Sequence, residues 1–163
     1  MDPSNQSPIR PPPCDAFPVY ERASAQDSDA GMSSKPHFLE PLLLANAGAH
    51  DLVIERTGLT LARTIELAQD SRTRTRGLLG RDGLADGSVM VIAPCNAVHT
   101  FFMRFAIDVV FTDRQGRVLK LTRHLKPWRV GAALRAFAAL EFAEGSIDTG
   151  GVREGDLLRI LAI

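Results

Sequence analysis

The residues best suited to chemistry lie in and around one apolar stretch of the chain. Cys95, His99 and Met103 are spaced four residues apart and carry ligand atoms that Cu(I) or Zn²⁺ accepts. Cys95 could instead act as a nucleophile with His99 as its base. The four-residue spacing is diagnostic of neither a metal site nor a nucleophile–base pair. No second Cys-His cluster in the sequence completes a tetrahedral metal site. We therefore expect Cys95 and Met103 to be core residues, and no cofactor is indicated.

A set of polar and aromatic residues forms the candidate ligand-binding rim. Strand alternation over residues 101–111 would place Phe101 and Met103 on the face of His99. Asp108 would lie on the other face unless a β-bulge reverses it. The candidate ligand-binding residues are His99, Phe101, Met103, Asp108, Glu141, Asp156 and Arg76.

Asp108 is a carboxylate within the apolar run Ile107–Phe111. Its burial must be compensated by hydrogen bonds or by an opposite charge. Backbone amides of a neighbouring loop, or an arginine such as Arg76, could provide this, and we favour such a structural role. The alternative is that Asp108, Glu141 and His99 converge as the acid–base groups of a small hydrolase or transferase.

Positive charge is concentrated in the middle of a chain whose net charge is zero. Residues 56–135 contain 14 Lys or Arg and 6 Asp or Glu, a net charge of +8. A weaker alternative site is an anion-binding surface of Arg123, Lys126, Trp128 and Arg129 around the single tryptophan. A solvated face is the simpler interpretation, and the overall charge does not favour nucleic acid as a partner.

The motifs of several large enzyme classes are absent from the sequence. No glycine-rich loop ends in Lys-Ser/Thr, and no Gly-x-Ser-x-Gly elbow occurs. These absences exclude the common NTPase, kinase, Rossmann dehydrogenase and α/β-hydrolase patterns. We expect a non-enzymatic ligand-binding or accessory protein, whose partner is a small molecule or another protein.

Short apolar segments broken by Gly and Asp must position these residues. The predicted strands are 42–44, 52–55, 60–68, 89–93, 101–111, 117–121, 138–142 and 156–161, with a hairpin turn at 113–116. A short helix over 72–79, capped by Asp70 and Ser71, is also predicted. The pattern predicts an α+β, mostly β fold: a small closed or nearly closed antiparallel β-barrel-like domain with one short helix.

The N-terminal quarter of the chain differs in composition from the rest. Residues 1–40 contain seven of the ten prolines, which predicts a disordered leader before a single β-rich domain over 41–163. No apolar run approaches the ~20 residues that cross a bilayer. The first residues also lack the basic and apolar regions of a secretory signal. We expect a cytoplasmic protein without membrane contact.

Three blocks in the second half of the chain resemble an uncharacterised bacterial and archaeal family, domain of unknown function 192. The blocks run over residues 72–81, 99–111 and 140–145, and the last is followed by Gly155 and Asp156. The middle block, His-Thr-Phe-x-Met followed by Ile-Asp-Val-x-Phe, is the most specific. In the first block Leu79 stands where the family usually has methionine. The resemblance spans roughly Arg72 to Asp156 and implies a compact, mostly β fold without an established activity.

Overall fold

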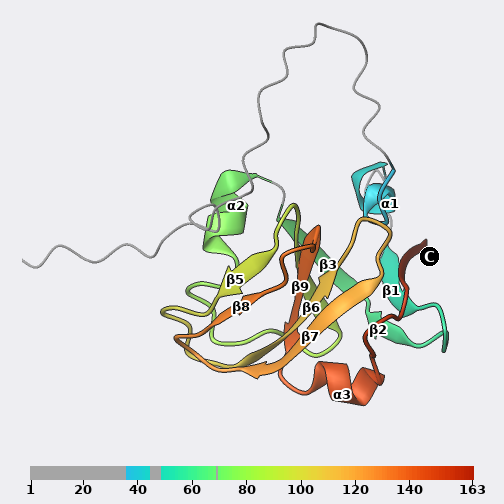
Figure 1. The fold of residues 1–163 in the computed structure, drawn as a ribbon. Helices are drawn as coiled ribbons and strands as arrows, with labels where there is room; N and C mark the ends of the chain where they lie inside the picture. Colours follow the sequence, from blue (N-terminus) through green and yellow to red (C-terminus); the bar gives the residue numbers. More distant parts are fainter. Residues whose placement is uncertain (1–35, 45–48, 69) are drawn as a thin grey trace, which may run out of the picture.

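The computed structural model describes residues 36–44, 49–68 and 70–163, which form ten strands and three short helices (Figure 1). The elements are α1 (Glu40–Leu44), β1 (His50–Ile54), β2 (Thr60–Ala62), β3 (Thr64–Ala68), α2 (Ser71–Arg76), β4 (Ser88–Ile92), β5 (Ala97–His99), β6 (Ile107–Thr112), β7 (Val118–Leu125), β8 (Val130–Ala132), β9 (Ala138–Ala143), α3 (Ser146–Gly150) and β10 (Leu158–Ala162). None of the described helices has the length and apolar character needed to span a membrane.

The strands form three sheets. The largest has the order β3-β4-β9-β6-β7, in which only β3 and β4 run parallel, and the others have the orders β10-β1-β2 and β5-β8. A bridge between Arg117 and Leu157 links the start of β7 to the segment before β10. The mostly β, α+β class is confirmed. No sheet in the described ranges closes on itself, so closure into a barrel is not confirmed.

The five-stranded sheet is covered on both faces. Its β6 strand is buried along its whole length, including the polar residues Asp108 and Thr112. One face, which includes Val110 and Leu140, packs against β1 and β10. The other face, which includes Val109 and Phe111, packs against the β5–β8 ribbon and the segment after α2. This second face carries the candidate site.

Most predicted elements are confirmed. The segments 52–55, 89–93, 138–142 and 156–161 correspond to β1, β4, β9 and β10, and the turn at 113–116 joins β6 to β7. The predicted helix cap is also present, because the Asp70 carboxylate accepts a hydrogen bond from the Thr73 N–H at 2.8 Å. The helix ends at Gly77 rather than at the predicted Gly80.

Three local predictions are wrong. Residues 42–44 belong to α1 rather than to a strand, because a run of three leucines has no period that separates helix from strand. The segment 60–68 breaks at Arg63 into β2 and β3, which join different sheets. The predicted strand 101–111 begins only at Ile107, because hydrogen bonds of Thr100 turn the chain away from the sheet.

The packed domain begins before the predicted boundary at residue 41. Leu39 is 1% exposed, and the Phe38 N–H donates to the Arg114 carbonyl at 2.9 Å. The Phe38 ring lies against Gly116, whose φ is +88° and where a Cβ would come within 2.9 Å of that ring and 2.5 Å of the Leu158 carbonyl. Residues 1–35 of the predicted leader lie outside the described ranges.

Candidate functional site

Three segments that are distant in the sequence meet at one small cavity beside the five-stranded sheet. Arg76 comes from the end of α2, His99 from β5, Met103 from the following turn and Glu141 from β9. We call this space the Glu141 cavity; its volume is about 20 Å³, which is the room for about one water molecule. Arg74, Gly77, Leu78, Leu79, Ile92 and Val98 complete its lining. Four of the seven candidate ligand-binding residues therefore line one space.

Glu141 reaches this cavity because of its register in the sheet. Its backbone lies opposite Met90 of β4 and Val109 of β6, so its side chain leaves the sheet on the same face as theirs. Leu140 and Phe142 point to the opposite core. Glu141 therefore shares its face of the sheet with apolar residues, and it is only 4% exposed, although Arg74, Arg76 and His99 line the same cavity. A carboxylate in such a place must be held by compensating interactions, and Glu141 has partners within the protein.

An ion pair two strands away shapes the electrostatics of this face. Glu66 of β3 lies in the same row as Met90 and Glu141, which puts the Glu66 and Glu141 backbones about 10 Å apart. Arg81 donates to both carboxylate oxygens of Glu66, at 2.8 and 2.6 Å. These hydrogen bonds lower the pKa of Glu66 and raise that of Arg81, and attraction to the negative charge of Glu141 raises the pKa of Arg81 further.

His99 is oriented by its neighbours on both sides. Its backbone pairs with Val130 of β8, and its ring stacks on Phe101 with centroids 5.1 Å apart and an interplanar angle of 18°. The residue is half-buried and its Nδ1 atom is shielded from solvent. Phe101 therefore contributes to the site by packing against the imidazole rather than by lining the cavity.

A larger groove adjoins the Glu141 cavity along α2. It has a volume of about 390 Å³ and shares Arg76, Gly77 and Leu79 with the cavity. Glu66, Leu67, Ala68, Thr73, Gly80, Arg81 and Met90 form the rest of its wall. We call it the α2 groove. Its size is that of pockets that hold small organic molecules.

Asp108 does not reach this site. Its carboxylate accepts hydrogen bonds from the N–H groups of His124, at 2.9 Å, and of Ile147, at 3.1 Å. It is buried on the face of β6 opposite to Val109 and Glu141. The convergence of Asp108 with Glu141 and His99, which the enzyme alternative required, therefore does not occur. The favoured alternative, pairing with backbone amides of neighbouring segments, is the one that the structure shows.

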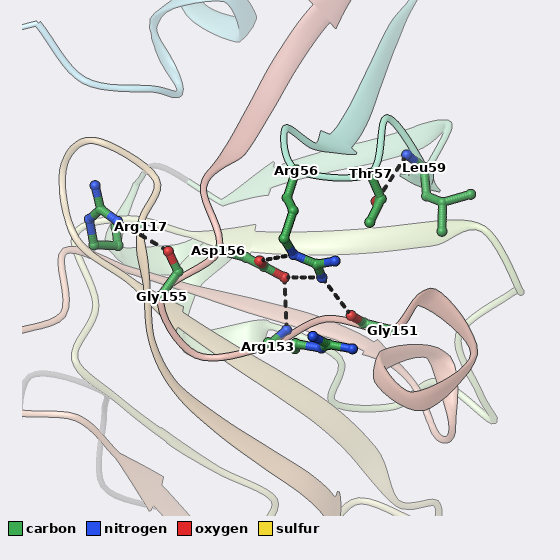
Figure 2. A network of polar contacts seen from close by, with 8 residues as sticks. All are labelled: Arg56, Thr57, Leu59, Arg117, Gly151, Arg153, Gly155 and Asp156. Atoms are coloured by element: carbon green, nitrogen blue, oxygen red, sulfur yellow. Dashed lines mark hydrogen bonds and ion pairs between the residues drawn. The ribbon is translucent and has the colours of Figure 1, made fainter.

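Asp156 also lies elsewhere, in a separate polar network (Figure 2). Arg56 Nε donates to Oδ1 at 2.7 Å and Nη2 to Oδ2 at 3.0 Å, and the Arg153 N–H donates to Oδ2 at 2.9 Å. Arg56 also donates to the Gly151 carbonyl at 3.2 Å. The hydrogen bonds from Arg56 are the main reason why the pKa of Asp156 lies below its ordinary value. This network connects the β1–β2 loop to the segment before β10.

Cys95 is buried and lies outside the Glu141 cavity. Its thiol Sγ donates to the Ala97 carbonyl at 3.0 Å. Among residues 36–44, 49–68 and 70–163, no three His, Cys, Asp or Glu side chains are grouped so that they could hold a metal ion. Within those ranges, Cys95 and His99 therefore belong to no such group.

The four residues of the predicted basic surface separate into two places. Arg123 forms an ion pair with Asp148 of α3 at 2.7 Å. Lys126, Trp128 and Arg129 occupy the connection between β7 and β8, where all three are exposed. Only these three remain together as a surface.

Sequence reasoning missed several residues that shape these sites. Arg56 and Arg81 hold carboxylates through paired hydrogen bonds, and Thr100 ties two loops together. Arg56 and Asp156 are 100 residues apart, so no local pattern connects them. Glu66 could have been noticed as the one charged residue of a short, mainly apolar strand.

Comparison with known proteins places this fold among uncharacterised ones. Residues 52–160 match the family model DUF192, described as Uncharacterized ACR, and no curated protein matches the chain. A crystal structure of a protein of unknown function from Novosphingobium aromaticivorans DSM 12444 is similar, with a TM-score of 0.58, 21% identity and coverage of 68% of this chain and 83% of that one. A putative transcription regulator from Sinorhizobium meliloti 1021 has a TM-score of 0.59, 19% identity and coverage of 72% and 98%. At these identities the likeness concerns the fold alone.

Proposed function

This chain belongs to the DUF192 family, and from that premise we propose that it is a non-enzymatic binding protein for a small organic anion. The anion, a carboxylate or a phosphate, occupies the α2 groove, and a small polar end of the ligand enters the Glu141 cavity. One observation supports this most strongly. Arg76, His99 and Glu141, from three separate segments, line one cavity, and Arg76 also lines an adjoining groove of ligand size.

The charges of the groove favour an anionic ligand. Glu66 and Arg81 neutralise each other through two hydrogen bonds. Arg76 is exposed and forms no ion pair within the described part of the chain. A guanidinium can bind a carboxylate or a phosphate through two parallel hydrogen bonds. Arg76 is therefore the charge to which we assign the anion.

The size of the Glu141 cavity favours binding over catalysis. A space of about 20 Å³ can receive a hydroxyl or amino group of a ligand. The reacting centre of a substrate would not fit in this space beside the Glu141 and His99 side chains. Glu141 and His99 would then select the polar end of the ligand. The alternative, an acid–base enzyme that uses these two residues without Asp108, draws support only from their shared cavity.

A thermal-shift experiment on the full chain tests the proposal. The probes are acetate, succinate, benzoate and phenyl phosphate, each compared with a neutral or cationic compound of similar size. A ligand at a hundredfold its dissociation constant stabilises a protein by about 2.7 kcal/mol, which corresponds here to a shift of roughly 10 °C. We expect such a shift from at least one anion and from none of the neutral or cationic compounds.

Two variants with a matched control locate the site. Arg76→Gln should abolish the anion-dependent shift, and Glu141→Gln should change which anion binds best. Arg72→Gln, an equal loss of charge at an exposed position of the same helix outside both spaces, should leave the shift intact. Equal shifts in wild type and Arg76→Gln would refute the anion site. Turnover of a bound probe that stops in Glu141→Gln would establish the enzyme instead.

A further inference from the structure

We propose that the protein has a second binding surface, made by Phe102, Lys126, Trp128 and Arg129, which binds single-stranded nucleic acid. We call it the Trp128 surface. It is independent of the α2 groove and shares no residue with it or with the Glu141 cavity.

Two large aromatic rings stand exposed on this surface. Trp128 is 54% exposed and Phe102 is 46% exposed, and their rings meet edge to face with centroids 4.6 Å apart. Both residues have left-handed backbone conformations, with φ of +62° and +65°. Such a conformation is costly for a bulky residue, and glycine would adopt it without strain. Neither backbone geometry nor burial in the core therefore explains why aromatic residues occupy these positions.

Contacts of Thr100 and Phe101 hold the two rings in place. Thr100 is fully buried, and its hydroxyl donates to the Lys126 carbonyl at 2.6 Å and accepts from the Arg129 N–H at 3.0 Å. Its backbone carbonyl accepts from the Trp128 N–H at 3.0 Å. Phe101 packs under the indole, with centroids 5.9 Å apart. The loop that carries Phe102 is thus fastened to the loop that carries Trp128, so a ligand would meet a preformed platform.

The segment that carries Trp128 is rich in cationic residues and contains no acidic ones. Residues 114–140 contain seven Lys or Arg and no Asp or Glu. They recur at every third position from Arg114 to Arg129, and the seventh is Arg135. Within the described residues, Lys126 and Arg129 form no ion pair with a carboxylate, and Arg129 donates instead to the Trp128 carbonyl at 3.0 Å. The surface therefore combines free positive charge with exposed ring faces.

Single-stranded nucleic acid is the polyanion that complements both features. Its unpaired bases can stack on aromatic side chains while its phosphates contact nearby cations. Bases in a duplex are already stacked and paired, and an anionic lipid surface offers no planar rings. The overall charge of zero did not favour nucleic acid from the sequence, but the potential that a ligand meets is local.

Because Trp128 is the only tryptophan of the chain, its own fluorescence reports on the surface. The test titrates the full chain with a labelled oligothymidine of about 20 nucleotides, an abasic strand of equal length and a duplex of equal length. We expect the oligothymidine to quench Trp128 and to raise the anisotropy of its label. The abasic strand should bind roughly 5- to 150-fold more weakly, as the loss of one stacked base predicts.

Variants separate the rings from the charges. Trp128→Leu should weaken oligothymidine binding roughly 5- to 150-fold and leave abasic binding unchanged. Lys126→Gln with Arg129→Gln should reduce the slope of log affinity against log salt by about 1.4, since each phosphate contact contributes ~0.7 for single strands. The control combines Arg63→Gln with Arg159→Gln, two exposed cations in or beside the β10-β1-β2 sheet, and should leave the slope unchanged.

Several outcomes would overturn the proposal. No quenching or anisotropy change at about 50 mM salt would exclude the nucleic-acid site. Duplex binding as tight as single-strand binding, or an unaffected Trp128→Leu variant, would exclude stacking on these rings. Binding to phosphatidylserine vesicles without binding to the oligothymidine would assign the surface to membranes.

Discussion

Asp108 and Asp156 show how a buried carboxylate can serve the fold rather than the chemistry. The Asp108 side chain accepts hydrogen bonds from two backbone amides, and Asp156 accepts two from Arg56 and one from a backbone amide. In both cases each carboxylate oxygen accepts at least one hydrogen bond, and at least one donor comes from a distant part of the chain. Glu141 differs because it lines a cavity that shares three wall residues with the α2 groove.

The Asp156 network predicts a pH dependence of stability. Hydrogen bonds from Arg56 hold the pKa of Asp156 below its value in the unfolded chain, which is near 3.9. Between those two values the unfolded chain binds a proton that the folded protein does not, so stability falls as the pH falls through this window. The Asp156→Asn variant should therefore be less stable than wild type at about pH 7, and this difference should shrink towards about pH 3.

Urea unfolding of both proteins at each pH measures this difference. The control is Asp86→Asn, an exposed carboxylate that forms no ion pair in the described part of the chain. Its free energy of unfolding should follow that of wild type at both pH values. A difference between wild type and Asp156→Asn that stayed constant from neutral to acid pH would show that the Arg56 pair contributes nothing to the titration.

At the scale of elements, the β5–β8 ribbon depends on the loops that follow β5 and precede β8. Thr100 joins these loops through its hydroxyl and both backbone groups. The same bonds turn the chain out of the extended path predicted for residues 101–111. They place Met103 in the lining of the Glu141 cavity and Phe102 on the Trp128 surface.

Replacing Thr100 with valine should loosen both loops. The substitution keeps the shape but leaves the Arg129 N–H without the hydroxyl that it donates to. A buried polar group left without its partner costs about 1–3 kcal/mol, so we expect a loss of stability of that size in urea unfolding.

Thr112→Val is the matched control for this substitution. Thr112 is fully buried on β6, and its hydroxyl oxygen has no hydrogen-bond partner in the described ranges. Removing an unsatisfied hydroxyl should be neutral or stabilising. Equal destabilisation by the two valine substitutions would mean that loss of shape, rather than of the hydrogen bonds, causes the effect.

At the scale of the whole molecule, the folded unit is longer than the stretch shared with its family. The family model begins at residue 52, but α1 and the residues before it pack on the same core. Leu39 belongs to that core, and Phe38 and Leu42 pack against it.

Leu39→Ala should therefore destabilise the protein by about 2–5 kcal/mol, the range for truncating a buried leucine. Leu44→Ala, five residues further along and 75% exposed, should change stability by less than about 0.5 kcal/mol. Midpoints of thermal or urea unfolding compare the two variants directly. A small effect of Leu39→Ala would mean that this segment is not part of the cooperative unit.

The sequence by itself determined the local elements. The mainly apolar strands β4, β6 and β9, the hairpin turn after β6 and the Asp70 cap of α2 each depend on a few neighbouring residues. Such patterns can be identified from the sequence because side-chain periodicity and turn chemistry involve residues that are close together along the chain. The resemblance to the family also came from contiguous blocks, and the family match confirms it.

Only the tertiary structure decided which of the candidate residues meet. Asp108 and Glu141 both lie in apolar strands, yet the register of β6 against β9 sends them to opposite faces. Arg56 finds Asp156 across 100 residues, and Arg76, His99 and Glu141 converge from three elements. A shift of one residue in strand pairing would exchange the faces. Convergence therefore depends on strand order and register, which are set by the packing of the whole core.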